Sequence, residues 1–173
     1  HTRWATHGVP NAKNAHPHSD KSGKFTLVHN GIIENYKILK EFLDDNDIVC
    51  QTDTDTEVLV QFIGFLYEKE KLDFIEIVRL ALKKVVGAYG IVVMCEDDPE
   101  TIIAARLGSP LLLGIGDNEY FVASDSSPII EYTRNIIFLD EGELAVINYN
   151  NYEVRNIVEN NVVTKNVEEI EYN

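Results

Sequence analysis

The pair Asn30-Gly31 follows the apolar run 24–29 and precedes a segment with helical periodicity at 35–46. Asn-Gly between apolar runs usually predicts a tight hairpin, but a hairpin fits the helical period poorly. A corner between strand and helix presents backbone N–H groups, and the Asn30 carboxamide can add a donor beside the Gly31 N–H. Two such donors could stabilise a developing oxyanion by about 3–4 kcal/mol each. A purely structural corner is the alternative interpretation.

The segment 52–57 reads TDTDTE, in which Thr54 and Glu57 have the spacing of a capping box. It predicts the start of a helix, whose positive end favours acidic residues. Asp55 at that start could bind the ammonium group of a substrate. The D-x-D-x-T pattern also suggests a Mg²⁺-dependent phosphatase with Asp53 as the nucleophile and Asp55 as the acid. Two polar residues interrupt the apolar strand that such a phosphatase needs, so the ammonium site is favoured over the phosphatase. A purely structural helix start, with a capping threonine and acidic residues in the first turn, is the alternative interpretation.

All five histidines and the only tryptophan lie within the first 29 residues: His1, Trp4, His7, His16, His18 and His29. Arg3, next to Trp4, offers a planar guanidinium that suits a carboxylate. The His16-Pro17-His18 pattern resembles a pair of metal ligands, but no third ligand at a suitable spacing supports it. We therefore predict loop histidines that hydrogen-bond backbone groups and close a pocket, with no metal site and no cofactor.

The two cysteines, Cys50 and Cys95, lie in apolar runs without a neighbouring histidine or glycine-rich turn that could activate a thiol. We expect both to be core residues rather than nucleophiles. Two cysteines make no disulfide framework, which favours a reducing cytoplasm. No secretory leader is visible, and no apolar run approaches the ~18–20 residues that a membrane span requires.

The composition describes one globular domain of 173 residues, of which 45% are apolar and 25% are charged. The formal net charge of −14 argues against nucleic acid or an anionic membrane as partner, because both repel such a surface. A small zwitterionic substrate responds to local charges instead and stays compatible with this total.

Several helices and strands must position these residues. The spacing of apolar residues along the chain changes near residue 88. Periods of three to four predict helices at 35–46, 52–70 and 73–85, with short strands at 24–29 and 47–51. From residue 88 a period of two predicts a series of strands, interrupted by a helical turn at 126–133: 88–96, 101–107, 110–116, 119–124, 135–140, 143–149 and 152–157. We therefore expect an α+β fold with a large, mainly antiparallel sheet system.

The strings HTRWATHG, NAHPH, HNGIIENY, TDTDTEV, GAYG, ARLGSPL, FVASD and IFLDEGELA occur in this order over nearly the whole chain. Together they resemble the glutaminase domain, a class II glutamine amidotransferase domain, of the glucosamine-6-phosphate synthase family. The resemblance implies a four-layer αββα sandwich of the N-terminal-nucleophile hydrolase type, incomplete at its N-terminus. It places Arg3 and Thr6 at the α-carboxylate of glutamine, Asp55 at its α-ammonium, and Asn30 with Gly31 at the oxyanion.

The same resemblance implies a loop, Arg3–Gly8, that closes over bound glutamine. Trp4 on this loop would keep water from the released ammonia, and His7 and His16 would line or brace the pocket. The nucleophile in the family is a cysteine at the mature N-terminus, whose own α-amine serves as the base. Neither cysteine of this chain matches that position, so we expect the 173 residues alone to be inactive.

The resemblance also implies that residues 1–173 are one glutaminase domain, whose last residues from about 168 begin a linker to sugar-phosphate isomerase domains. The parent enzyme would be a cytoplasmic homodimer that hydrolyses glutamine and passes ammonia to fructose 6-phosphate. Two alternatives stay open at this point. One is a glutamine-binding regulatory module without chemistry, and the other is the phosphatase around Asp53.

Overall fold

The computed structural model describes residues 6–171. Its helices are α1 (Tyr36–Asp44), α2 (Asp55–Lys69) and α3 (Phe74–Leu82), preceded by a short 3₁₀ turn at Ala12–Asn14. The strands are β1 (His18–Ser19), β2 (Phe25–Ile33), β3 (Gly87–Cys95), β4 (Asp98–Leu107), β5 (Leu112–Ile115), β6 (Tyr120–Ala123), β7 (Asn135–Phe138), β8 (Glu143–Ile147), β9 (Tyr152–Asn156) and β10 (Glu168–Glu169). The predicted α+β class is confirmed.

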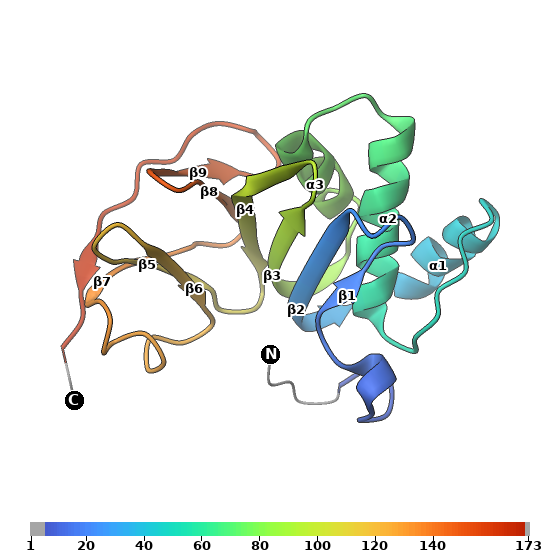
Figure 1. Ribbon diagram of the computed structural model, residues 1–173, viewed down its shortest axis with the longest axis horizontal. Coiled ribbons are helices and arrows are strands. Elements are labelled where there is room, and N and C mark those ends of the chain that lie inside the picture. Colours follow the sequence, from blue (N-terminus) through green and yellow to red (C-terminus); the bar gives the residue numbers. More distant parts are fainter. Residues whose placement is uncertain (1–5, 172–173) are drawn as a thin grey trace.

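The strands form two antiparallel sheets (Figure 1). The six-stranded sheet has the order β1-β2-β3-β4-β8-β9, and the four-stranded sheet has the order β10-β7-β5-β6. In the larger sheet, β2 pairs with β3 over nine residues, with Asn30 opposite Gly90 and Gly31 opposite Tyr89. Glu168–Glu169, where we predicted the start of a linker, pair with β7 in the smaller sheet.

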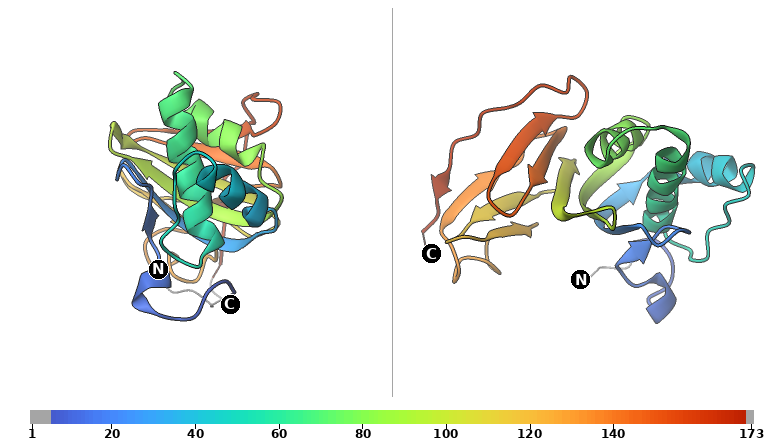
Figure 2. Two further views of the ribbon diagram at one scale, coloured as in Figure 1. Left: turned by 90° about the vertical axis from the view of Figure 1, so that its right-hand side faces the viewer. Right: turned by 45° about the horizontal axis from the view of Figure 1, so that its top comes forward.

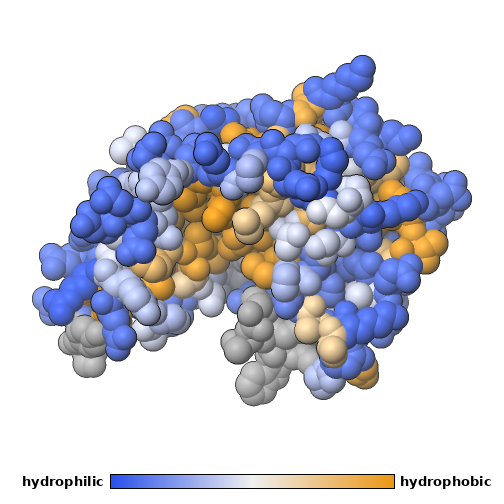
Figure 3. All heavy atoms as spheres, viewed as in Figure 1, coloured by the Kyte–Doolittle hydropathy of each residue, from blue (hydrophilic) through white to orange (hydrophobic). Residues whose placement is uncertain are grey.

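The three helices cover one face of the six-stranded sheet, and the four-stranded sheet lies on the other side of its β4-β8 region (Figures 1 and 2). Strand β4 shows how one sheet serves two cores, because successive side chains point to opposite faces. Ile103 and Ala105 are buried beneath the helices, whereas Ala104 is buried between the sheets. Figure 3 shows apolar residues lining the hollow between the part with the helices and the part with the four-stranded sheet.

Helix α2 forms the centre of the helical layer. The Thr54 hydroxyl caps it by accepting a hydrogen bond from the N–H of Glu57 at 3.2 Å, as the predicted cap requires. All of its first ten residues, Asp55–Gly64, are buried. Its polar first turn is therefore held inside the protein, which places Asp55 among interior groups rather than in solvent.

Two local predictions differ from the structure. Residues 47–51 form no strand, although Ile48 is buried against the helices. N–H groups of this segment bond to helices instead of to a neighbouring strand: Ile48 donates to the oxygen of Leu43, and Gln51 donates to the Glu57 side chain. In addition, Asn30-Gly31 does not end its strand: β2 continues to Ile33 before the chain turns into α1.

The outer face of the four-stranded sheet is covered by turns rather than by a helix within residues 6–171. The predicted helical turn at 126–133 is present as hydrogen-bonded turns, and Ile129 from this segment packs on Leu112 and Ile136. The described layers are therefore one helical layer and two sheets, and the fourth layer of the sandwich stays a prediction. Within the same residues, no helix is long and apolar enough to cross a membrane.

Candidate functional site

Asp55 lies at the first turn of α2 with only 2% of its surface exposed. Its Oδ2 accepts a hydrogen bond of 2.7 Å from the backbone N–H of Ile33, at the end of β2. The carboxylate thus connects the start of the helix to the strand, two residues beyond Gly31. A buried negative charge needs such partners, and the positive end of α2 favours it further.

Gly31 has a backbone conformation that the strand would not allow to a larger residue. Its φ is +130°, and a Cβ built there would lie 2.1 Å from the carbonyl oxygen of Ala88. Gly87 on the paired strand mirrors it, with φ +131° and a Cβ position 2.2 Å from the oxygen of Ile32. Two glycines therefore let the β2 and β3 backbones approach closely beside Asn30, whose side chain is exposed.

Histidines from the first 29 residues hold the same helix start. His18 Nε2 lies 3.2 Å from the Thr54 hydroxyl, and His29 Nδ1 lies 3.0 Å from the Thr56 hydroxyl. The other nitrogen of His29 lies 3.3 Å from the oxygen of Ala88, the atom that faces Gly31. The backbone N–H of His29 in turn donates to Nδ1 of His16 at 3.3 Å.

The loop before the first strand packs on the same segment. The N–H of Asp53 donates to Asn14 Oδ1 at 3.1 Å, and His7 Nδ1 lies 3.5 Å from the oxygen of Asp53. The His7 ring also meets the Tyr36 ring edge-on, with centroids 4.4 Å apart. Gly8, with φ +72°, lies against Asn14 and Asp53, where a Cβ would come within 2.7 Å of Asn14 Nδ2. These contacts hold the described part of the loop against the segment before α2, and the bracing role of His7 and His16 stays a prediction.

The structure brings together Asp55, Asn30, Gly31, His7 and His16, which we predicted from the sequence. Thr6 is exposed at the start of the described residues. Arg3 and Trp4 lie outside the described residues, so the proposed carboxylate clamp and lid rest on the sequence alone. Within residues 6–171, no group of three or more His, Cys, Asp or Glu side chains could hold a metal ion.

Sequence reasoning assigned no individual role to His29, Thr56 or Asn14, which tie the loop and β2 to the start of α2. It grouped His18 with loop histidines that bond backbone groups, whereas His18 lies in β1 and its ring meets the Thr54 hydroxyl. The clustering of histidines in the first 29 residues was the available signal, but the partner of each ring depends on tertiary contacts. Glu57 is a further example. It does not close a capping box on Thr54, because its carboxylate accepts from the N–H groups of Gln51 and Thr52 instead.

Glu57 anchors the irregular segment that leads into α2, and only 3% of it is exposed. Burial alone would raise the pKa of its carboxyl group. Hydrogen bonds from the backbone of Gln51, from Thr52 and from the Gln61 side chain outweigh burial and lower that pKa below its ordinary value. The charged form of Glu57 therefore stabilises the folded protein, and this contribution is present above the unfolded-state pKa.

Replacing Glu57 by glutamine is expected to lower the free energy of unfolding at pH 7 by about 1–3 kcal/mol, because charged hydrogen bonds to backbone N–H groups are lost. The difference from the unsubstituted protein should shrink as the pH falls below the ordinary glutamate pKa and through the lowered folded pKa. Urea unfolding between about pH 7 and pH 3 measures both effects. Glu68→Gln, at an exposed position on the same helix, is the control and should change little.

The two cysteines have different surroundings. Cys95 is buried in the core, and Cys50 is half-buried in the segment before α2. Burial raises the pKa of the Cys50 thiol to about 11, with the Glu57 carboxylate adding to the effect, and burial also raises the pKa of Cys95. Neither thiol has the lowered pKa of an activated nucleophile.

Both thiols are expected to react slowly with a thiolate-selective reagent at about pH 8. A pKa raised from 9.0 to about 11 reduces the thiolate fraction of Cys50 roughly 100-fold relative to the unfolded chain. Alkylation followed by mass spectrometry, in native buffer and in urea, checks this ratio. Fast native alkylation of either residue would contradict its placement as an unactivated thiol.

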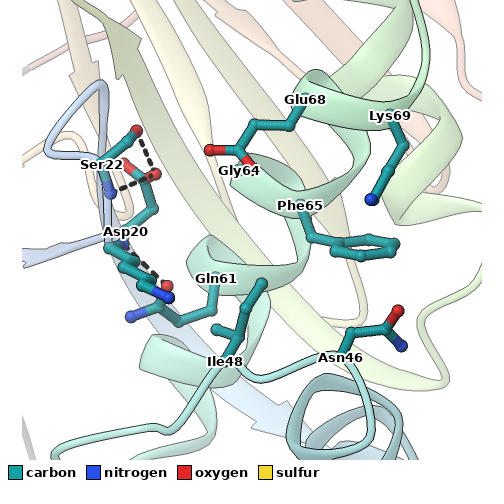
Figure 4. Close-up of a pocket in the computed structure, with 10 residues that line it drawn as sticks. Asp20, Ser22, Asn46, Ile48, Gln61, Gly64, Phe65, Glu68 and Lys69 are labelled. Atoms are coloured by element: carbon teal, nitrogen blue, oxygen red, sulfur yellow. Dashed lines mark hydrogen bonds between the residues drawn. The ribbon is translucent and has the colours of Figure 1, made fainter.

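A separate cavity of about 330 Å³ lies beside residues 61–69 of α2. Figure 4 shows the residues that line it: Asp20, Lys21, Ser22, Asn46, Ile48, Gln61, Gly64, Phe65, Glu68 and Lys69. Its deeper polar groups are already paired within the protein. Asp20 accepts from Ser22 and from the N–H of Phe25, and Gln61 accepts from the N–H of Lys21. This cavity includes none of the predicted site residues.

Comparison with known proteins decides the family. Residues 1–131 match the family of glutamine amidotransferase domains. The chain belongs to this family. Its relatives place it in class II of these domains.

Among curated relatives of this amidotransferase domain, a glutamine–fructose-6-phosphate aminotransferase [isomerizing] of Bacteroides thetaiotaomicron is 53% identical over 148 residues. The match covers 86% of this chain and 24% of that protein. The protein of the same name from Chlorobaculum tepidum is 47% identical, over 99% of this chain and 28% of its own length. The chain thus spans about a quarter of the length of these relatives.

A solved structure supports the same assignment of fold. The glutamine phosphoribosylpyrophosphate amidotransferase of B. subtilis, in complex with ADP and GMP, superposes with a TM-score of 0.74 at 26% sequence identity. The match covers 92% of this chain and 34% of that chain. The amidotransferase domain therefore keeps the fold of a distant relative across almost its whole length.

Proposed function

We propose that this amidotransferase domain hydrolyses the side-chain amide of glutamine and supplies ammonia to fructose 6-phosphate, for synthesis of glucosamine 6-phosphate by its parent protein. By parent protein we mean the full-length gene product that contains these residues. One observation carries the proposal most directly. The buried Asp55 carboxylate is hydrogen-bonded at 2.7 Å to the strand that carries Asn30 and Gly31, so an ammonium site and an amide site share one corner.

The chemistry of glutamine fits two sites at a fixed separation. Its α-ammonium would pair with Asp55, and its α-carboxylate would bind Arg3 with help from Thr6. These two ion pairs would orient the glutamine side chain and exclude simple amides, which lack both charges. The reacting carbonyl oxygen would then lie at the Asn30 carboxamide and the Gly31 N–H, which stabilise the oxyanion of the tetrahedral intermediate.

The remaining loop residues would control access. The Arg3–Gly8 loop would close over glutamine, with Trp4 separating water from the released ammonia and His7 with His16 bracing the wall. The contacts of His7 with Asp53 and Tyr36 support this role for the described part of the loop. The nucleophile would be an N-terminal cysteine of the parent protein, since Cys50 and Cys95 are unactivated and outside this corner.

The partners follow from the relatives rather than from the domain itself. Proteins similar to this chain are named for transfer of nitrogen to fructose 6-phosphate, which implies sugar-phosphate isomerase domains in the same parent chain. We infer a cytoplasmic parent enzyme that acts as a homodimer. The 173 residues alone would release no ammonia.

The test is an assay of the parent protein with glutamine, with and without fructose 6-phosphate. We expect release of glutamate and ammonia, and formation of glucosamine 6-phosphate when the sugar phosphate is present. Glutamine binding without hydrolysis would favour a regulatory module instead. Hydrolysis of a generic phosphate ester that is lost in Asp53→Asn would favour the phosphatase, and ammonia release by the 173 residues alone would show that the nucleophile is assigned wrongly.

A further inference from the structure

We propose that the hydroxyl of Ser109 contacts the reacting carboxamide of glutamine, as a third polar group beside Asn30 and Gly31. Ser109 belongs to the ARLGSPL segment after β4, for which the proposed function gives no role. The inference rests on the proposed function, because it names a further substrate contact in the same site. It would make the site selective for an amide over other γ-glutamyl compounds.

The position of Ser109 is defined by the two glycines that it covers. A Cβ on Gly31 would lie 3.0 Å from Ser109 Oγ, and a Cβ on Gly90 would lie 3.6 Å from Ser109 Cβ. Gly90 is the residue that pairs with Asn30 across the β2–β3 ladder. Ser109 therefore lies beside both members of the Asn30-Gly31 pair, although it is nearly 80 residues away in the sequence.

The hydroxyl of Ser109 is available for a ligand. Ser109 is half-buried, and its Oγ makes no hydrogen bond with any residue in the range that the structure describes. A half-buried hydroxyl without a protein partner gains more from a hydrogen bond with a ligand than a fully solvated one, because part of its hydration is already lost. Its place next to the amide site makes the glutamine side chain the natural partner.

The turn that carries Ser109 is fixed from the other side. Glu141 accepts a hydrogen bond of 2.6 Å from the N–H of Gly108 and pairs with Arg106 Nη2 at 2.8 Å. Arg106 also donates through Nη1 to the oxygen of Leu139 at 2.6 Å. These bonds connect the ARLGSPL and IFLDEGELA segments, so Ser109 is presented by a braced turn rather than by a loose loop.

Gly108 allows this turn to approach β3 closely. Its φ is +71°, and a Cβ there would lie 2.9 Å from the Cβ of Ala88. Ala88 is also the residue whose carbonyl oxygen faces Gly31 and His29. The turn, the β3 strand and the Asn30-Gly31 pair therefore form one packed unit, which holds the Ser109 hydroxyl at a constant place relative to the pair.

The chemistry of a carboxamide explains why a hydroxyl would help. In the proposed site Asn30 Nδ2 and the Gly31 N–H donate to the carbonyl oxygen, whereas the amide nitrogen of glutamine carries two N–H donors that need acceptors. A serine hydroxyl can accept one of them. An ester of the same amino acid has no such N–H, so the contact would favour glutamine over γ-glutamyl esters.

The experiment measures kcat/KM of the parent protein for glutamine and for glutamate γ-methyl ester. Ser109→Ala and the nearly isosteric Ser109→Cys should each lower kcat/KM for glutamine about tenfold, since one hydrogen bond is lost. Both should stay within about threefold of the unsubstituted protein with the ester. Ser126→Ala, at another half-buried serine on the far side of the smaller sheet, is the matched control and should leave both substrates unchanged.

Three results would overturn the inference about Ser109 while leaving the proposed function intact. They are unchanged glutamine hydrolysis in Ser109→Ala, equal losses with amide and ester, and normal activity of Ser109→Cys, which would show that the residue acts by packing alone. An unsubstituted parent protein that releases no ammonia from glutamine would overturn the proposed function and this inference together.

Discussion

The Asp55→Asn variant of the parent protein is expected to lose kcat/KM for glutamine by roughly 30-fold or more, mainly through a higher KM. Removing one partner from a buried, hydrogen-bonded charge pair costs about 2–5 kcal/mol, and the α-ammonium is far from the bond that breaks. Asparagine keeps a carbonyl oxygen that can still accept the 2.7 Å hydrogen bond from Ile33. The variant therefore removes the charge of residue 55 while the hydrogen bond between α2 and β2 is kept.

Asp53→Asn is the matched control for this experiment. Asp53 precedes the helix, is exposed, and its carboxylate makes no hydrogen bond among residues 6–171. Glutamine hydrolysis should change less than about twofold in this variant, within the range of ordinary surface substitutions. Equal losses in Asp53→Asn and Asp55→Asn, or a loss only in the former, would contradict the placement of the substrate ammonium at Asp55.

Replacing Gly31 by alanine is expected to lower the free energy of unfolding by about 3–5 kcal/mol and to abolish glutamine hydrolysis. The added Cβ would lie 2.1 Å from the oxygen of Ala88, and φ +130° is closed to L residues in any surroundings. The β2 and β3 backbones would have to separate at Asn30 and Gly31, the proposed oxyanion donors. Thermal unfolding should show a fall of roughly 10 °C in the midpoint.

The Gly23→Ala variant separates the cost of the positive φ from the cost of the steric clash at Gly31. Gly23 also has a positive φ, +77°, but a Cβ there meets nothing within 4 Å. Its substitution should cost only the backbone strain, about 1 kcal/mol, with activity retained. A Gly31→Ala variant no less stable than Gly23→Ala would show that β2 and β3 do not need their close approach.

The sequence predicted the elements that rest on local patterns. Thr54 and the acidic residues after it marked the start of α2, and a period of two predicted seven strands after residue 88. The short strand predicted at 47–51 was wrong because Ile48 packs against the helices while the N–H of Gln51 bonds to Glu57. That partner lies in the next helix and leaves no periodic signal in the segment itself.

For the candidate site, the sequence singled out Asp55 and the Asn30-Gly31 pair as residues, and the structure connects them through the hydrogen bond from Ile33 to Asp55. Their roles toward glutamine stay predictions. The contacts of His18 and His29 could not be predicted, since nothing in the spacing of these histidines shows that they meet Thr54 and Thr56. Ser109 illustrates the same limit more strongly. It reaches the site only through the antiparallel pairing of β2 with β3 and the brace at Glu141.

A crystal structure of the parent protein with its product glutamate tests the central claim most directly. The account predicts the α-ammonium nitrogen of glutamate about 2.7–3.2 Å from an Asp55 carboxylate oxygen. It also predicts a γ-carboxylate oxygen at the same range from Asn30 Nδ2 and the Gly31 N–H. Glutamate bound elsewhere, or bound here with its ammonium turned away from Asp55, would contradict the account.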